Sequence, residues 1–205
     1  MKLKISWIEV DQDLIPHSEL DSANDLKYVS NEILEAFEIG GYSEEIELDE
    51  KLLLIIASVY SSKLIPDIHK AIKIYELGRW GKLLSGDVVT VIGETLTYAL
   101  LVQLFDVKIE DVLPLRNVKY LGTIVDLAIN IEKYEKLREF LNAKRGTLFV
   151  DAKATMSYKR SYILSRLSHS LVALESLRYP DNYALLSYII KYNNQLYDLG
   201  VIIRP

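Results

Sequence analysis

The sequence contains no cysteine, and this absence excludes disulfides and thiolate metal sites. It also has no apolar run of the ~20 residues that a membrane-spanning helix needs. The longest candidate, residues 87–106, contains Glu94 and is better interpreted as a buried helix. Charged residues soon follow residues 1–4, so we expect no secretory signal. These absences together predict a cytoplasmic protein that makes no membrane contact.

Positive charge is scarce in the first half of the chain. Residues 1–106 hold 9 Lys and Arg against 19 Asp and Glu, a balance of −10, whereas residues 107–205 hold 15 against 10, a balance of +5. This asymmetry indicates contact with a polyanion on the basic half, or else an ordinary solvated surface. Half of the 205 residues are apolar, which is enough to form a sizeable hydrophobic core without covalent cross-links.

The acidic first part of the chain favours helices. A short strand is expected at residues 3–10, followed by helical patterns at 23–37, 50–64 and 67–77, with Asp49 and Asp67 at the starts of the last two. No motif that carries chemistry is present there. We therefore predict a mostly helical region at residues 1–85, packed on a core formed by residues 86–205.

The second part predicts an α/β core in the order αβββαβ. Ser85 begins a long apolar helix over residues 88–105, and three strands are expected at 107–115, 120–131 and 147–155. The charged link between the last two has room for a helical turn. A helix at 158–178 and strands at 183–190 and 200–203 follow.

Two of the expected strands carry an acidic residue among apolar neighbours. Because side chains i and i+2 of a strand share a face, Asp151 and Lys153 project together. Asp126 lies in the preceding strand, and a carboxylate is costly to bury unless it is paired or binds a metal. The alternatives are an exposed edge-strand pair for Asp151 and Lys153, and an acid at the rim of the sheet for Asp126.

These side chains suit a hard cation beside a fixed positive charge. Mg²⁺ or Mn²⁺ takes oxygen ligands and keeps several waters, so Asp126 and Asp151 are the expected direct ligands. Glu94 in the long helix is the expected third carboxylate, with Asp111 as the alternative. Lys153 would orient the attacking water or stabilise charge on a pentavalent phosphorus, as phosphodiester hydrolysis requires.

Three short segments, in this order of elements, resemble the PD-(D/E)XK nuclease superfamily. They are Gly93-Glu94, Ile124-Val125-Asp126 and Phe149-Val150-Asp151-Ala152-Lys153. The resemblance covers residues 86–190 and is greatest to small archaeal and archaeal-virus members similar to Holliday-junction resolvases. It implies a restriction-endonuclease-like core with a mixed central sheet.

The resemblance also implies a function and partners. It implies a Mg²⁺- or Mn²⁺-dependent DNA nuclease with Glu94, Asp126, Asp151 and Lys153 as its catalytic residues. DNA junctions and flaps are among the substrates that the resemblance suggests. A homodimer, no organic cofactor and a location in the cytoplasm, the host's if the protein is viral, are expected with it. The proline that often precedes the first aspartate is replaced by Val125.

Three basic residues follow the acidic strand at the start of the next helix. Lys159, Arg160 and Arg166 are expected to contact DNA phosphates, which position a duplex without reading its sequence. The alternative is a solvated helix face. The competing function is a nuclease fold without catalysis, acting in DNA binding or protein assembly.

Overall fold

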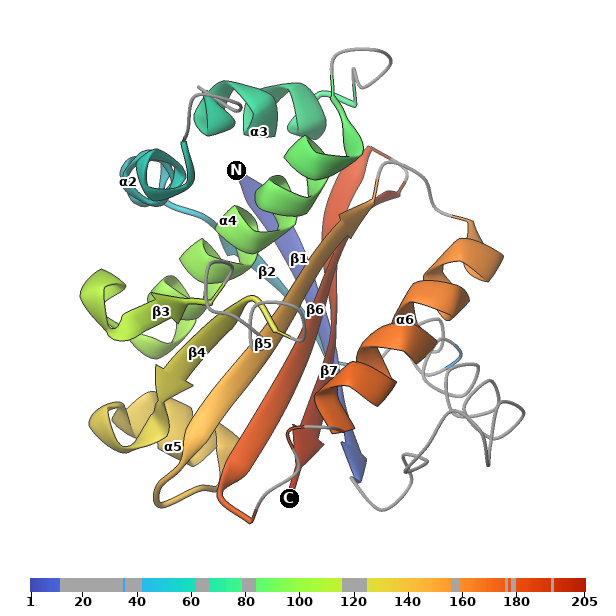
Figure 1. The fold of residues 1–205 in the computed structure, drawn as a ribbon. Coiled ribbons are helices and arrows are strands. Elements are labelled where there is room, and N and C mark those ends of the chain that lie inside the picture. The colour runs from blue at the N-terminus through green and yellow to red at the C-terminus, as the bar shows by residue number, and fades with distance from the viewer. Residues whose placement is uncertain are drawn as a thin grey trace.

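The structure is a computed structural model, and it describes residues 1–11, 35, 42–61, 67–78, 84–115, 125–155, 159–175, 177, 180–192 and 194–205. Its fold is mixed α/β, as predicted. A seven-stranded sheet in the order β2-β1-β7-β6-β5-β4-β3 runs through the molecule, with helices on both faces (Figure 1). The helix expected at residues 23–37 lies outside the described residues, apart from the helical Glu35.

The sheet combines parallel and antiparallel pairs. Strands β3, β4 and β5 form an antiparallel meander, whereas β5 and β6 pair in parallel and are joined through α6. Strand β7 is antiparallel to β6 and parallel to β1, whose other neighbour is the antiparallel edge strand β2. The strand bounds are β1 (Lys2–Asp11), β2 (Tyr42–Glu47), β3 (Val112–Pro114), β4 (Leu127–Asn130), β5 (Thr147–Thr155), β6 (Asn182–Tyr192) and β7 (Gln195–Arg204).

The helices begin at the predicted caps where these are described. The Asp49 carboxylate accepts the backbone N–H groups of Lys51 and Leu52 at 2.6 and 3.0 Å, and Asp67 caps the next helix in the same way. The helix bounds are α2 (Glu50–Tyr60), α3 (Ile68–Glu76), α4 (Gly86–Phe105), α5 (Glu135–Leu141) and α6 (Arg160–Glu175), with 3-10 turns η3 (Ile109–Asp111) and η5 (Ile131–Lys133).

The two faces of the sheet bury separate apolar clusters. Helices α2 to α5 pack on one face and α6 packs on the other. Side chains therefore alternate along β6, where Leu185 and Ile189 face α4 while Leu186 and Ile190 face α6. Helix α4 is long and apolar enough to cross a membrane, but 72% of its most apolar window is buried inside the protein. Burial in the core accounts for its composition.

Several predicted elements differ from the observed ones. Residues 107–115 were expected to be one strand, but the polar Ile109–Asp111 segment forms η3 and only Val112–Pro114 is extended. Of the strand expected at 120–131, residues 120–124 lie outside the described part, and the ladder covers Leu127–Asn130 before the chain turns into η5. Strand β7 is longer than the expected residues 200–203, and β2 was not predicted.

The predicted division of the chain at residue 85 does not divide the sheet. Residues 1–85 were expected to be mostly helical, yet β1 lies within the sheet between β2 and β7. Leu3 to Asp11 pair in register with Leu196 to Arg204, and the side chains of Leu3 and Ile5 are buried in the same cluster as α4. The N-terminal region thus contributes strands as well as α2 and α3 to the core.

Candidate functional site

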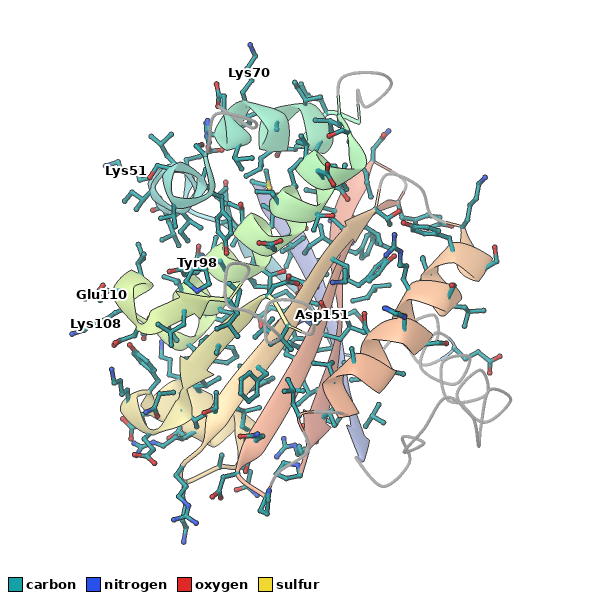
Figure 2. The ribbon with its side chains drawn as sticks, in the orientation of Figure 1. Lys51, Lys70, Tyr98, Lys108, Glu110 and Asp151 are labelled. Carbon is teal, nitrogen blue, oxygen red and sulfur yellow. The ribbon has the colours of Figure 1, made fainter. Side chains whose placement is uncertain are left out.

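The structure brings Asp126, Asp151 and Lys153 together on the face of the sheet that α6 covers. Asp151 and Lys153 share this face because they are two residues apart on β5. Asp126 precedes β4, and its backbone N–H donates to the Val150 carbonyl at 2.8 Å. Figure 2 shows Asp151 in the interior, between α4 and α6. The two carboxylates are therefore buried neighbours, as predicted.

Lys153 is the charge partner of both aspartates. Its Nζ contacts Asp151 Oδ1 and lies 3.7 Å from Asp126 Oδ2. Asp126 Oδ2 also accepts the backbone N–H of Ala152 at 2.8 Å. Only 2% of Asp151 and 8% of Asp126 is exposed, so this ion pair is screened by little water. We call Asp126, Asp151 and Lys153 the carboxylate–lysine cluster.

The pKa values in the cluster reflect both burial and the charges of neighbouring side chains. Burial, with a smaller contribution from the neighbouring Asp151 carboxylate, raises the pKa of Asp126 to about 6, against the opposing effects of Lys153 and the Ala152 N–H. Burial lowers the pKa of Lys153, but attraction to Asp151, Asp126 and Glu94 outweighs this and leaves that pKa above its ordinary value. Lys153 therefore stays cationic at neutral pH.

Glu94 is placed beside the cluster by the close approach of α4 to β5. A Cβ at Gly93 would lie 2.7 Å from the carbonyl carbon of Lys153 and 2.8 Å from the Ala154 nitrogen, so only glycine fits this crossing. Glu94 follows directly, is 1% exposed, and attracts the Lys153 ammonium. Across the described ranges, however, no three Asp, Glu or His side chains form a group that could hold one metal ion.

Asp111, the alternative third carboxylate, belongs to a different cluster. It precedes β3, and the register of β3 with β4 puts it at the opposite end of this ladder from Asp126. Its carboxylate pairs with Lys133 Nζ at 2.7 Å and accepts the Tyr134 hydroxyl. Of the two candidates for the third carboxylate, Glu94 and not Asp111 therefore lies beside Asp126 and Asp151.

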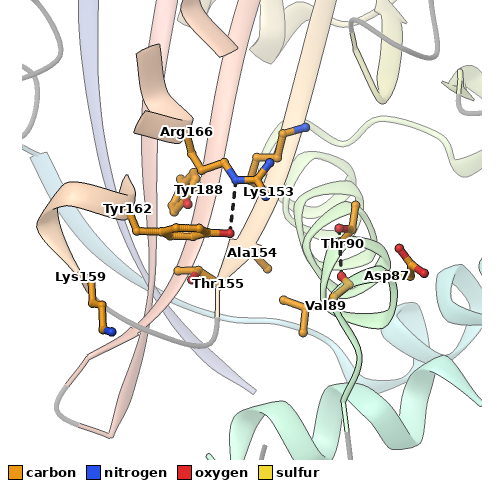
Figure 3. A pocket seen from close by; sticks show the side chains of 11 residues that line it. Asp87, Val89, Thr90, Lys153, Ala154, Thr155, Lys159, Tyr162, Arg166 and Tyr188 are labelled. Atoms are coloured by element: carbon orange, nitrogen blue, oxygen red, sulfur yellow. Dashed lines mark hydrogen bonds between the residues drawn. The ribbon is translucent and has the colours of Figure 1, made fainter. Parts of the chain in front are cut away.

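A cavity of about 520 Å³ adjoins the cluster through Lys153. The first turns of α4 form one wall, α6 forms the other, and the end of β5 lies between them (Figure 3). Two of the predicted DNA-contacting residues, Lys159 and Arg166, line it; the Arg160 side chain lies outside the described residues. We call this cavity the α4–α6 pocket.

The sequence favours a core position for Tyr162 over stacking or phosphate contact, and it assigns no role to Tyr188. Tyr162 is 42% exposed, and the Arg166 guanidinium carbon lies 5.4 Å from the centre of its ring. Tyr188 is buried beside Lys153 across the parallel β5–β6 pair, and burial raises its pKa. With 14 tyrosines in the chain, only the position of Tyr162 four residues before Arg166 on the predicted helix signalled this pairing.

Sequence analysis missed one further buried carboxylate, in addition to Glu94, Asp126 and Asp151. Asp198 on β7 is fully buried and accepts the Trp7 indole N–H at 2.9 Å and the Ser187 hydroxyl at 2.8 Å. The Ser187 hydroxyl lies 2.6 Å from that of Thr97 on α4. The rule that singled out Asp126 and Asp151, an acid between apolar residues, applies equally to Asp198 between Tyr197 and Leu199.

Comparison with known proteins identifies no relative with which this site could be compared. No protein-family model, curated protein or solved structure matches the chain significantly.

Proposed function

We propose that the chain is a metal-dependent DNA nuclease of the PD-(D/E)XK type. The observation that carries this proposal is the carboxylate–lysine cluster, in which Asp126, directly before β4, meets Asp151 and Lys153 of the neighbouring β5. The topology supports it, since from α4 to β6 the chain runs helix, three strands, helix and strand, with α5 and two 3-10 turns inserted. Restriction-endonuclease-like cores share this order, as the sequence resemblance implies.

The donor set fits a hard divalent cation. Burial is the main reason that the pKa of Asp126 is raised to about 6, and the neighbouring Asp151 carboxylate adds to the effect. A bound cation would offset this cost of burying the charged carboxylate. The candidate ligands are oxygens, the preference of Mg²⁺ and Mn²⁺. Asp126 and Asp151 would hold the ion. Glu94 would reach it through a bound water, because the three carboxylates do not form one metal-holding group in the described part of the chain. When bound, the ion would supply Lewis-acid activation of a water and neutralise phosphate charge.

The protein's own side chains would divide the remaining work. Lys153 is held cationic by its acidic neighbours, so it would act as a fixed positive charge toward the phosphate and not as a general base. Lys159 and Arg166 stand beside it on the pocket wall, where they would hold the phosphates that flank the reacting one.

The proposal is tested by cleavage of plasmid, single-stranded, flapped and four-way-junction DNA with Mg²⁺ or Mn²⁺. We expect the wild type to cut at least one of these substrates, and Asp151→Ala and Lys153→Ala to lose that activity. If the wild type and both variants cleaved none of these substrates, the proposed catalysis would be refuted. A homodimer and a cytoplasmic location stay predictions from the sequence, and sedimentation would test the first.

One observation favours a second candidate function, a nuclease fold that binds DNA or a protein without catalysis. Lys153 Nζ already contacts Asp151 and lies near Asp126, so an internal ion pair can satisfy both carboxylates without a metal. This alternative predicts no heat of Mn²⁺ binding by calorimetry and DNA affinity that Asp126→Asn leaves unchanged. The nuclease proposal predicts a binding heat that Asp126→Asn abolishes.

A further inference from the structure

The α4–α6 pocket is lined by aromatic and apolar side chains as well as by charged ones. It has about 520 Å³ of space, within the range of pockets that hold small organic groups. Its entrance carries the cations of Lys159 and Arg166, and its inner end meets Lys153 of the carboxylate–lysine cluster (Figure 3). A group bound here would therefore adjoin whatever reacts at the cluster.

The Tyr162 ring and the Arg166 guanidinium together form part of the pocket wall. The guanidinium of Arg166 lies over the Tyr162 ring, and its Nε is 3.2 Å from the Tyr162 hydroxyl. Within the described parts of the chain, no carboxylate forms an ion pair with Arg166 or Lys159. Aromatic rings and guanidinium planes are the surfaces on which unpaired bases stack, while adjacent cations hold the backbone.

We propose that the α4–α6 pocket binds an unpaired nucleotide, with its base stacked on the Tyr162–Arg166 pair and its phosphate held by Lys159. This inference rests on the proposed nuclease function for its substrate class. It predicts that the substrate is DNA with a single-stranded segment next to the scissile bond. A blunt duplex keeps its bases stacked inside, so it would present only backbone to the pocket.

Binding without cleavage tests the pocket separately from the chemistry. Fluorescence anisotropy would be measured in EDTA, and again with Ca²⁺, for a single-stranded oligonucleotide, a duplex with a single-stranded tail and a blunt duplex of equal length. We expect both oligonucleotides with unpaired bases to bind about tenfold more tightly than the blunt duplex. Tyr162→Leu should weaken their binding by about tenfold and leave the blunt duplex unaffected.

Two matched variants separate stacking from general effects. Tyr162→Phe keeps the ring and should bind as the wild type does, and it should quench a 2-aminopurine placed in the tail, whereas Tyr162→Leu should not. Lys159→Gln should weaken binding, while Lys51→Gln on α2, a lysine at the periphery in Figure 2, should not. Equal affinity for blunt and tailed DNA, or equal weakening of both by Tyr162→Leu, would overturn the inference.

The two proposals fail in distinguishable ways. If no DNA is cleaved but single-stranded binding still depends on Tyr162, the pocket assignment stands without the nuclease. If blunt duplex is cleaved as fast as tailed duplex, and Tyr162→Leu changes neither rate, the nuclease stands and the pocket assignment fails.

Discussion

At the scale of single residues, buried carboxylates determine how the protein responds to pH. Asp198 is enclosed by Trp7, Ser187 and the sheet, and burial raises its pKa to about 6 despite the hydrogen bonds that it accepts. Because the unfolded chain releases this proton near pH 4, the folded state holds it more tightly between these values. The stability that this proton contributes is complete below pH 4 and is lost as the pH rises through 6.

Asp198→Asn should remove this pH dependence. A shift of about two pKa units corresponds to about 3 kcal/mol, so the free energy of unfolding of the wild type, relative to Asp198→Asn, should fall by that amount between pH 4 and pH 7. Urea unfolding of both proteins at the two pH values would measure it. Parallel pH profiles would show that Asp198 titrates as it does in the unfolded chain.

The residues of the candidate site were partly predictable from the sequence. Asp126, Asp151 and Lys153 stood out because each interrupts an apolar strand, and the i, i+2 rule placed two of them on one face. The pairing of Arg166 with Tyr162, and the placement of Glu94 beside the carboxylate–lysine cluster, were harder to predict from the sequence. They depend on how α6 and α4 cross the sheet, which no local pattern specifies.

At the scale of elements, the crossing of α4 over β5 fixes the position of Glu94. Gly93→Ala would push a methyl group against the backbone of Lys153 and Ala154, which cannot move aside as a side chain can. We expect it to lower the free energy of unfolding by about 2 kcal/mol, although alanine is the better helix former. Gly86→Ala is the matched control on the same helix, because nothing lies within 4 Å of its Cβ position.

Chemical denaturation would compare these two variants with the wild type. Gly86→Ala should be neutral or stabilising by up to about 1 kcal/mol. If Gly93→Ala were equally harmless, the helix and strand would have more room between them than the structure gives, and the positioning of Glu94 by this contact would be wrong.

Elements with strong periodicity were predicted well, and edge or polar elements were not. Strand β5 was placed at its exact residues and α4 within two residues of its start, because both are apolar and well bounded. Strand β2 (Tyr42–Glu47) escaped notice because it is charged, as edge strands often are. The predicted β7 began at Gly200 because Asp198 and Gly200 interrupt its apolar run, although both are buried by neighbours far away in sequence.

At the scale of the whole molecule, the sheet unites the acidic first half with the basic second half. Strand β1 covers β7 along its length, and Trp7 donates to Asp198 from the opposite end of the chain. A fragment of residues 86–205 would expose that strand and lose the buried side chains of Leu3, Ile5 and Trp7.

We expect this fragment to lack a cooperative unfolding transition. Circular dichroism during urea titration would measure it, with the full chain as the control. A sharp transition with the sheet signal of the full chain would contradict this expectation and would show that residues 1–85 are a separable region.

The central claim, that the carboxylate–lysine cluster hydrolyses DNA, is tested most directly by initial cleavage rates. The substrate is a labelled duplex with a single-stranded tail, in Mg²⁺ and in EDTA, for the wild type, Asp151→Asn, Lys153→Gln and the remote control Lys51→Gln. We predict metal-dependent cleavage that Asp151→Asn and Lys153→Gln each reduce about 100-fold or more while Lys51→Gln does not. Cleavage that persists in both cluster variants, or in EDTA, would contradict the account.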